Sequence, residues 1–559
     1  MSPATGLLVL TRPAASIVAS LPRVLSAASK QVGRTLYVHL DPLAQTKIPD
    51  TTRPLTLYSH IVSSVYARSP SLCRGLEVRV LLAGFKGPVP HPPKTQRPID
   101  VLILEGVTGE ARVEVEGRYR GCLTSGGDVV VIEECEGDVE TSEGSGGVSL
   151  PSPLPTDKVY PSVVVGGTFD RPHAGHLVFL STALMRCGDK LTCGVADGPL
   201  LKKKTLTELI KPIEERMVGV VELVGELDPT IDCRVYAIEE PLGPTRWEPD
   251  MDMIVVSEET KRGVEAINKV RKENDLRLLE GHIVPLVEDE IRESSEEEAK
   301  VSSSSMRMRL LGTVLQEPLP NPSIPSRPYV IGLTGGSATG KSSVAKRIAK
   351  LGAAVIDCDK VGHEAYLPGT ACHEALVKAF GVDIVGEDGH INRPALAAKV
   401  FGDEKARTSL NEIVWPEIQR LVEKKVSQLA SEGVKVVVLD AAVLLEAGWE
   451  RRCHQVWVCI VKREEAVRRI VERDGKTPEE AERRLDSQMS TTERIERANV
   501  VFCTQWSGEY TQKQVERAWA TLSARLVEAG SGSEKSVDNA VSGGGDEGGT
   551  ISPPPKSRV

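Results

Sequence analysis

The sequence is poor in aromatic residues and lacks the cysteine spacing of a zinc site. Phe, Tyr and Trp make up 4% of its 559 residues, which disfavours a base-stacking platform for nucleic acid. The 11 cysteines are scattered, and the closest pairs, Cys187/Cys193 and Cys453/Cys459, have five residues between them rather than two. We expect free thiols in a reducing compartment.

Positive charge is not in excess either. The chain has 69 Lys and Arg against 78 Asp and Glu, a net charge of -9, which argues against general nucleic-acid binding. Apolar residues make up 40% of the chain, which is ordinary for a soluble protein with buried cores. The expected partners are therefore small molecules rather than nucleic acid.

Residues 1–40 contain no acidic residue. They are rich in Ala, Ser, Leu and Val and carry Arg12, Arg23, Lys30 and Arg34. This composition is typical of a mitochondrial targeting segment or a peripheral membrane-surface anchor, so the expected location is mitochondrial (outer membrane or matrix), cytoplasmic, or both. The apolar run at 6–10 is too short to span a bilayer. An ordinary strand and helix is the alternative.

The rest of the chain is expected to contain three folded regions of the α/β class. Its length suggests about three domains, and apolar runs separated by linker-like composition place them. The predicted order is a small α/β region of unknown function at 41–135, a linker at 136–157, a folded unit at 158–315, a Pro-rich linker at 316–328, a second folded unit at 329–528 and a disordered tail at 529–559. No catalytic constellation is found in 41–135.

The second folded unit opens with a phosphate-binding loop. The pattern Gly-x-x-x-x-Gly-Lys-Ser follows an apolar run at 330–333 and precedes helical spacing of Val344, Ile348 and Leu351. The residues predicted to hold the triphosphate are Gly335, Gly336, Ser337, Ala338, Thr339, Gly340, Lys341, Ser342 and Ser343. Backbone N–H groups and Lys341 would contact phosphates, and Ser342 would hold Mg²⁺.

Acidic and basic side chains downstream fit a kinase. Asp357 and Asp359 follow a short apolar run, and either could accept a hydroxyl proton or cap the next helix. Asp440 ends another apolar run and is predicted to be associated with Mg²⁺. The charged stretch at 462–488 is predicted to form a helical lid over the phosphates, with the candidates Arg463, Arg469, Arg473 and Arg484.

The first folded unit has a second phosphate-binding pattern. An apolar run at 163–165 leads into Gly166, Gly167 and Thr168, and then His173 and His176 begin a helix. The two imidazoles would stabilise charge on transferring phosphates. They lack the third ligand of a zinc site.

The residues of this unit resemble the T/HxGH nucleotidyltransferase superfamily. The string GGTFDRPHAGH and the later VSSSSMR, at 301–307, carry the likeness, and their spacing is similar to that of phosphopantetheine adenylyltransferases. The resemblance implies a Rossmann-like domain that transfers an adenylyl group from ATP to 4'-phosphopantetheine. It implies ATP contacts from Gly167, Thr168, Phe169, His173, His176, Ser303, Ser304 and Arg307. It also implies a lysine at the acceptor phosphate, for which Lys203 is favoured and Lys202 and Lys204 stay alternatives, and it makes His176, Lys203 and Arg307 the catalytic residues.

Residues 329–505 resemble the dephospho-CoA kinases. The strings GLTGGSATGKSSVA, VIDCD, LLE and RDGKTPEEAERRLDSQMS carry this likeness. It implies a parallel-sheet P-loop kinase in which Lys341, Asp359 and Arg473 are catalytic. Asp359 would be the base for the ribose 3'-hydroxyl, and Arg473 and Gln488 would belong to the lid. Trp415-Pro416 and the stretch 498–502 depart from the family pattern on the acceptor and adenine sides.

The two resemblances concern consecutive reactions. Together they are similar to the family of bifunctional coenzyme A synthases, with ATP and Mg²⁺ used in synthesis of dephospho-CoA and then of coenzyme A. One alternative is an adenylyltransferase for another phosphate, such as nicotinamide mononucleotide, fused to a nucleoside-type kinase. A non-enzymatic scaffold is another, but intact Lys341, His176 and Arg307 argue against it.

Overall fold

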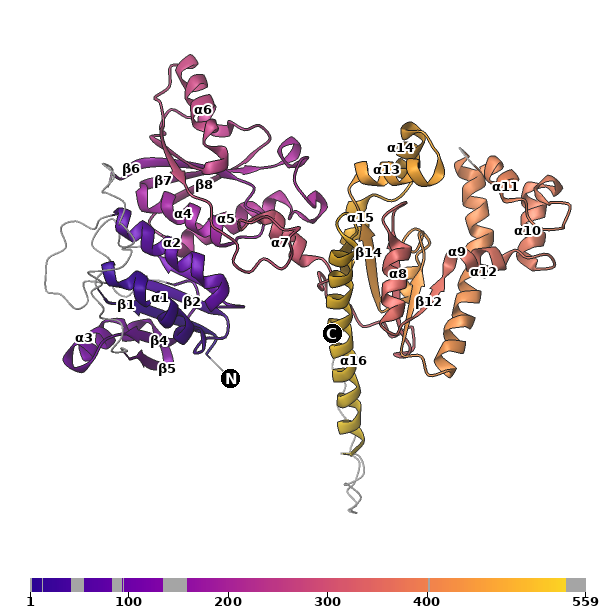
Figure 1. Cartoon of the computed structure of the whole chain (residues 1–559), viewed down its shortest axis with the longest axis horizontal. Helices are drawn as coiled ribbons and strands as arrows, with labels where there is room; N and C mark the ends of the chain where they lie inside the picture. Colours follow the sequence, from indigo (N-terminus) through magenta and orange to yellow (C-terminus); the bar gives the residue numbers. More distant parts are fainter. Residues whose placement is uncertain are drawn as a thin grey trace, which may run out of the picture. The chain divides into compact units, whose positions relative to one another are not determined.

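A computed structural model describes residues 3–12, 14–41, 55–82, 93, 95–133, 158–400 and 403–538. These residues form two compact units, Met1–Met308 and Arg309–Val559. The expected α/β class is confirmed, since the described residues form three five-stranded sheets whose paired strands are all parallel (Figure 1). Among the described helices, none is long and apolar enough to cross a membrane.

The N-terminal domain is a complete parallel α/β fold. Its sheet has the order β3-β2-β1-β4-β5. Its elements are β1 (Thr5–Leu10), α1 (Ala14–Ser29), β2 (Thr35–Leu40), α2 (Leu55–Leu72), β3 (Glu77–Leu81), β4 (Ile99–Glu105), α3 (Gly109–Tyr119) and β5 (Leu123–Ile132).

This fold corrects the expected boundary at residue 40. Every residue of the central strand β1 is buried, and Ile17, Leu21 and Leu25 of α1 belong to the core with no exposed surface. The scarcity of acid in this stretch therefore reflects burial, since charged residues are rarely buried unpaired. The alternative of an ordinary strand and helix is the one that the structure shows. Removing residues 1–40 as a cleaved presequence would take away the middle of the sheet.

The middle domain has the same strand order, because its sheet runs β10-β9-β6-β7-β8. Counted along the chain, both sheets are ordered third, second, first, fourth, fifth, which is a Rossmann-like order. Its elements are β6 (Tyr160–Gly167), α4 (Ala174–Arg186), β7 (Cys187–Ala196), α5 (Ile213–Leu227), β8 (Asp232–Ile238), β9 (Met253–Ser257), α6 (Arg262–Glu273), β10 (Glu280–Val284) and α7 (Ser303–Leu310), with short 3-10 turns between.

The C-terminal unit has a sheet of order β12-β13-β11-β14-β15. Residues such as Leu333, Trp457 and Phe502 form its fully buried core. Its elements are β11 (Tyr329–Gly335), α8 (Lys341–Lys350), β12 (Ala354–Asp357), α9 (Cys358–Ala365), α10 (Ala371–Phe380), α11 (Arg393–Val400), α12 (Glu404–Ser431), β13 (Val436–Asp440), β14 (Gln455–Ile460), α13 (Arg463–Asp474), α14 (Pro478–Asp486), α15 (Thr491–Glu496), β15 (Val500–Cys503) and α16 (Gly508–Asp538). Helix α8 packs on α16, and α12 packs on α9 and α10 (Figure 1).

The segment before β11 belongs to this unit and is not a free linker. Residue 315 was expected to end the preceding unit, yet Leu315 N–H donates to Asn499 O at 2.7 Å and Gly312 N–H donates to Val501 O at 2.9 Å. Gly312 has φ +77°, and a Cβ there would lie 2.1 Å from Gln514 O. This close approach lets the backbone add to the edge of β15. Farther on, Asn321 Nδ2 donates to Arg451 O at 2.9 Å.

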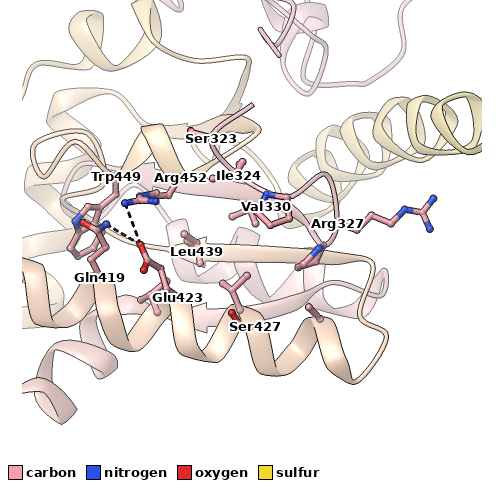
Figure 2. A pocket seen from close by; sticks show the side chains of 15 residues that line it. Ser323, Ile324, Arg327, Val330, Gln419, Glu423, Ser427, Leu439, Trp449 and Arg452 are labelled. Carbon is pink, nitrogen blue, oxygen red and sulfur yellow. Dashed lines mark hydrogen bonds and ion pairs between the residues drawn. The ribbon is translucent and has the colours of Figure 1, made fainter. Parts of the chain in front are cut away.

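The same segment covers a cavity beside α12 (Figure 2). Residues 323–328 lie over it, and Val330 of β11 and Leu439 of β13 line it from the sheet. Its volume is about 280 Å³. Gln419 and Glu423 line it from α12, and Glu423 forms an ion pair with Arg452 at 3.5 Å. The proline-rich composition of 316–328 thus belongs to a packed wall of the C-terminal unit.

The C-terminal boundary also differs from the expectation. The disordered tail was expected to begin at residue 529, whereas α16 continues to Asp538. The remainder of that prediction, 539–559, lies outside the described residues, as does the predicted linker at 136–157.

The central position of β1 gives a stability prediction. Leu8→Ala, at a site with no exposed surface, should destabilise the N-terminal unit by about 2–5 kcal/mol because it leaves a cavity in the core. Calorimetric unfolding should show a lower transition for this unit. Fluorescence of the tryptophans, five of which (415, 449, 457, 506, 519) lie in the C-terminal unit, should report an unchanged transition.

The matched control is Val113→Ala on α3, because Val113 is 73% exposed. It should change stability by less than about 0.5 kcal/mol. Equal transitions for the Leu8 and Val113 variants would contradict the buried placement of β1.

Candidate active sites

The first cavity lies at the carboxyl ends of the middle-domain strands, where ligands bind in open α/β sheets. Its volume is about 260 Å³. Elements far apart in sequence contribute to it, namely the end of β6, the start of α4, the ends of β9 and β10, and the start of α7. Of the predicted ATP contacts, Gly167, Thr168, Phe169, His173, His176, Ser303, Ser304 and Arg307 all line it.

The loop between β6 and α4 is held in a strained conformation. Phe169 and Arg171 have φ of +48° and +54°, a left-handed region that side chains rarely adopt. A Cβ on Gly167 would lie 3.2 Å from the Phe169 ring, and one on Gly175 would lie 3.1 Å from the His173 ring, so a side chain at either position would crowd these rings. Such strain persists where the surroundings impose it, most often at functional sites.

The two predicted histidines face the cavity together. Their rings stack with centroids 3.9 Å apart, and the Phe169 ring lies 5.5 Å from that of His176. Burial lowers the pKa of His176 to about 4, against the attraction of Asp170, and Lys204 adds to the lowering. His176 is therefore neutral near pH 7, and it would act on a phosphate as a hydrogen-bond donor rather than as a cation.

Arg307 joins three parts of the site. Its Nη1 donates to Asp170 Oδ2 at 2.7 Å, and its Nε donates to Thr205 O at 2.8 Å. Both partners of the ion pair are almost fully buried. The guanidinium was predicted to neutralise phosphate. In this structure it joins α7 to two loops, the one between β6 and α4, which carries Asp170, and the one at 202–206, which carries Thr205. Asp170 was not selected from the sequence, although it stands within the quoted GGTFD string.

Of the three successive lysines Lys202, Lys203 and Lys204, Lys204 is the one that lines the cavity. Lys203 was favoured as the acceptor contact, but Lys204 lines the cavity and acts on His176, whereas Lys203 does not line it. Sequence could not reveal this choice among three successive lysines.

Arg216 of α5 joins the loop between β6 and α4 to the end of β7 and was missed. It is 2% exposed and donates to Thr168 O at 3.0 Å and to Asp197 Oδ1 at 2.8 Å. The string KPIEER, in which it stands, was the available signal.

The predicted serine-rich helix start is present. Helix α7 begins at Ser303, and Ser302 Oγ accepts from the backbone N–H of Ser305 at 3.1 Å. This side-chain cap satisfies one free N–H of the first turn. Ser303 and Ser304 remain at the cavity, where their hydroxyls and the helix end favour an anion.

The second cavity surrounds the P-loop of the C-terminal unit and has a volume of about 640 Å³. All nine predicted loop residues, 335–343, line it together with Asp359 and Arg473. Gly340 caps α8 at φ +79°, and a Cβ there would lie 2.7 Å from Thr504 Oγ1. The loop thus places its backbone N–H groups at a helix N-terminus, as phosphate binding requires.

Lys341 and Asp440 meet beside this cavity. The Lys341 ammonium forms a short ion pair with Asp440, at the end of β13. Burial raises the pKa of Asp440, and the nearby Lys341 opposes that rise.

The structure separates the two aspartates that follow β12. Asp357 caps α9, because its Oδ1 accepts from the N–H of Lys360 at 3.1 Å. Burial raises its pKa, but the hydrogen bonds and charge of Lys360 outweigh this, and the pKa is lowered overall. Asp359, in the first turn of α9, lines the cavity. The residue that lines the cavity and the residue that caps α9 are therefore different.

The lid candidates take different positions on α13 and α14. Arg473 and Arg484 line the cavity and share Asp474 as a partner. Arg469 also lines it, but it donates to Ala338 O at 3.1 Å and so supports the left-handed turn of the P-loop. Arg463 pairs with α14 through Glu482 and does not line the cavity.

Gln488 links the lid to the P-loop. Its Oε1 accepts from Ser337 N–H at 2.9 Å, and its Nε2 donates to Ser337 Oγ at 2.7 Å. Arg494, which sequence analysis missed, is 2% exposed and pairs with Glu446 of the quoted LLE string at 2.5 Å. It is one helical segment beyond the lid motif, and no local pattern marked it.

The two departures from the family pattern lie away from the P-loop. Trp415 and Pro416 line a separate cavity of about 460 Å³ with Trp449. Asn499 bonds to Val456 N–H at 2.8 Å and to Gln316 O at 3.0 Å. The altered strand therefore holds the segment that precedes β11.

This geometry defines the C-terminal unit as a P-loop kinase with a helical lid. Residues 329–507 match the family described as "Dephospho-CoA kinase". The dephospho-CoA kinase of Geobacter sulfurreducens is 44% identical over 191 residues, which is 34% of this chain and 97% of that protein, and that of Symbiobacterium thermophilum is 42% identical over 190 residues, 34% of this chain and 80% of that protein. The chain belongs to the dephospho-CoA kinase family.

The other parts of the chain also match known families. Residues 164–309 match the family described as "Cytidylyltransferase-like", and residues 4–103 match "COASY N-terminal domain".

A solved structure from Thermus thermophilus is 33% identical, with a TM-score of 0.31, and the match covers 36% of this chain and 98% of that one.

The burial of His176 predicts a pH effect on the stability of the unit Met1–Met308. An unfolded histidine titrates near about 6.5, while folded His176 titrates near pH 4 because of its burial. Between these values the unfolded chain binds a proton that the folded chain does not, so stability is present above pH 6.5 and falls as pH drops toward 4. Calorimetry from pH 7 to 4.5 should show this fall.

His282, whose pKa burial also lowers to about 4, contributes in the same direction. His176→Gln should flatten the profile in part and His282→Gln in part. An NMR titration of the His176 ring with a midpoint near 6.5 would contradict the buried, neutral assignment.

Proposed function

We infer that this chain is a bifunctional enzyme of the last two steps of coenzyme A biosynthesis. It transfers an adenylyl group from ATP to 4'-phosphopantetheine and then phosphorylates the ribose 3'-hydroxyl of dephospho-CoA with a second ATP. The observation that carries this is the joint presence of the two sites. The family of the C-terminal unit acts on dephospho-CoA, and the site of the middle domain has the groups for making it.

In the first step, an oxygen of the substrate's phosphate attacks the α-phosphorus of ATP. The P–O bond to pyrophosphate breaks, and no protein nucleophile is needed. The chain contributes position and charge. Neutral His176 donates a hydrogen bond, Lys204 supplies positive charge, and the hydroxyls and N–H groups at the start of α7 hold the phosphates that leave.

In the second step, Asp359 accepts the proton of the ribose hydroxyl, whose oxygen attacks the γ-phosphorus and releases ADP. The P-loop N–H groups and Lys341 hold the β- and γ-phosphates. Arg473 and Arg484 of the lid approach the same cavity and would neutralise charge on the transferring group. Closure of the lid excludes water, which would otherwise accept the phosphoryl group.

Mg²⁺ is proposed as the metal of the kinase step. Ser342 lines the cavity, and Asp440 forms an ion pair with Lys341, which also lines it. Hydroxyl and carboxylate oxygens are suitable ligands, so these two residues fit the ion. When bound, Mg²⁺ would offset negative charge on the phosphates. Lys341 would exchange Asp440 for phosphate when the nucleotide enters.

A mitochondrial, membrane-surface or cytoplasmic location stays a prediction. Because β1, α1 and β2 are part of the folded core, we propose that any targeting or anchoring role of residues 1–40 uses their folded surface. Lys30 and Arg34 are exposed and basic there, which would suit an anionic membrane surface.

Paired variants test the two steps in one chain. With 4'-phosphopantetheine, ATP and Mg²⁺, His176→Ala should block formation of dephospho-CoA. Lys341→Ala should block only the second step, so dephospho-CoA should accumulate. Chromatography of the products measures both. Normal coenzyme A formation by Lys341→Ala would show that the kinase assignment is wrong.

Substrate choice in the first step is tested by pyrophosphate release. 4'-Phosphopantetheine should support release and nicotinamide mononucleotide should not. The opposite result would favour the adenylyltransferase of another phosphate named above.

The two aspartates of α9 provide a matched pair for the kinase step. Asp359→Asn should lower kcat by about 10²–10⁴-fold with little change in KM, because it removes a general base. Asp357→Asn should retain most activity, since Asn caps a helix as well as Asp does. The assay is ADP release with dephospho-CoA supplied. Equal losses in the two variants would contradict the assignment of Asp359.

A further inference from the structure

The N-terminal domain repeats the architecture of the middle domain element by element. In the N-terminal domain the order is β1-α1-β2-α2-β3 and then β4-α3-β5. In the middle domain it is β6-α4-β7-α5-β8 and then β9-α6-β10. Both sheets are parallel throughout and have the same strand order. Two adjacent copies of one topology, one with a phosphate site, raise the question of what the other does.

The described residues at the corresponding edge of the N-terminal domain carry no counterpart of the phosphate site of the middle domain. Strand β6 ends on two glycines, and α4 carries His176, whereas β1 ends on Val9 and Leu10, and α1 follows without either histidine. Backbone N–H groups there lack the glycine turns that would let a phosphate approach.

Charged side chains of the chain itself occupy that edge. Arg12, just after β1, pairs with Glu105 at the end of β4, Nε to Oε1, at 3.3 Å, and the Glu105 side chain has no exposed surface. Thr11 Oγ1 donates to Glu105 O at 3.0 Å. Since removing one partner would leave a buried charge uncompensated, this pair keeps the position closed to a phosphate.

The outer part of the edge is filled in the same way. Asp41, just after β2, accepts from the Tyr119 hydroxyl at 2.5 Å and from Arg118 Nη1 at 3.1 Å. Burial raises the pKa of Tyr119, and the charge of Asp41 adds to the effect. Arg12 with Glu105 and Arg118 with Asp41 thus form ion pairs within the domain at this edge.

The N-terminal domain also covers helix α4 of the middle domain. Helix α4 packs on β6 and β7 of its own domain and on α2 of the N-terminal domain. Its sequence, AGHLVFLSTALMR, has no charged residue before Arg186, and Ser181 and Leu184 have no exposed surface. A helix that is apolar all round needs a layer on each side.

Specific contacts join the two domains beside this helix. Tyr66 of α2 is fully buried, and Ser181 of α4 lies close enough to affect its pKa, which burial raises to about 12. Glu226 of α5 accepts from the Tyr37 hydroxyl at 2.5 Å and from Arg79 Nε at 3.1 Å. One hydrophobic core runs through both domains.

We propose that the N-terminal domain is a non-catalytic copy of the nucleotidyltransferase fold that covers α4 and so positions His176. Its ligand edge is closed by its own ion pairs, and its work is done by the helical face. His176 lies in the first turn of α4, so a shift of this helix moves the imidazole away from the phosphate. The role is one of positioning.

Cleavage of the full chain tests the shared core directly. A site for a sequence-specific protease is placed in the Gly/Ser-rich stretch at 142–147, and the cut protein is passed over a sizing column under native conditions. The two fragments should elute together and retain adenylyl transfer. Separation of the fragments, with full first-step activity in the one that contains α4, would overturn the proposal.

Substitutions at the interface test positioning. Ser181→Lys places a charge between α4 and α2 and should lower first-step kcat by about 10²-fold, with little change in the KM for ATP. The cut variant should separate into fragments. Val218→Lys is the matched control, because Val218 of α5 is 55% exposed. The kinase step, assayed with added dephospho-CoA, should be unchanged in both and reports that the chain is folded.

The activity readout rests on the proposed function, whereas fragment association does not, so the two can fail separately. If Ser181→Lys does not fold in its own unit, the cleavage of the unsubstituted chain still decides. Calorimetric titration with a non-hydrolysable ATP analogue tests the closed edge. Two equivalents per chain are expected. A third equivalent that is lost in Arg12→Ala would show that the N-terminal domain binds nucleotide.

Discussion

Parallel strand pairing is the constraint on which the rest of this structure depends. Parallel neighbours need a crossover between them, usually a helix, and the sheet must be covered on both faces. The carboxyl ends of all strands then meet at one edge, where loops and helix N-termini converge. The three sheets of this chain each create such an edge. What differs among them is the set of side chains delivered there.

The three edges handle buried charge in three ways. In the middle domain, Arg307 and Asp170 form a permanent pair that holds loops together and leaves Lys204 and the histidines for the ligand. In the C-terminal unit, Lys341 is paired with Asp440 beside an open cavity, and the phosphates of a nucleotide can replace that partner. In the N-terminal domain, Arg12 and Glu105 pair where a ligand would bind. An ion pair at such an edge can thus hold the loops of a site together, give way to a phosphate, or occupy the position of a phosphate, according to the residues around it.

Local motifs made the phosphate sites predictable from sequence. The P-loop residues 335–343 all line one cavity, and so do the predicted contacts around His176, because glycine turns before a helix encode their own geometry. Residue type alone did not separate Asp359 from Asp357, since both can cap a helix; the family resemblance favoured Asp359, and the structure places Asp359 at the cavity and Asp357 at the cap of α9. Lys204 was not separable from Lys203, because successive lysines are chemically alike and only the folded loop places one of them at the cavity.

Long-range packing explains the errors. Acid-poor composition at 1–40 fits a targeting segment as well as a buried β1 and α1, and only the neighbouring strands β2 and β4 distinguish them. The segment 316–328 resembles a free linker by its prolines, but the edge of β15 and the wall of α12 provide partners for it. Arg494 and Arg216 hold parts of their sites together by donating hydrogen bonds to backbone carbonyls. Such contacts leave no mark in a short motif.

The sequence of α4 contained a signal that was available and not used. A helix on one face of a sheet in a soluble domain normally shows a polar stripe toward water. From Leu177 to Met185 the polar residues are only Ser181 and Thr182, and both are buried. Such a helix requires a second layer, and the adjacent domain at 3–133 is the part of the chain able to supply one within the same unit. The absence of a polar face on a catalytic helix therefore points to the neighbouring domain as part of the machinery that holds it.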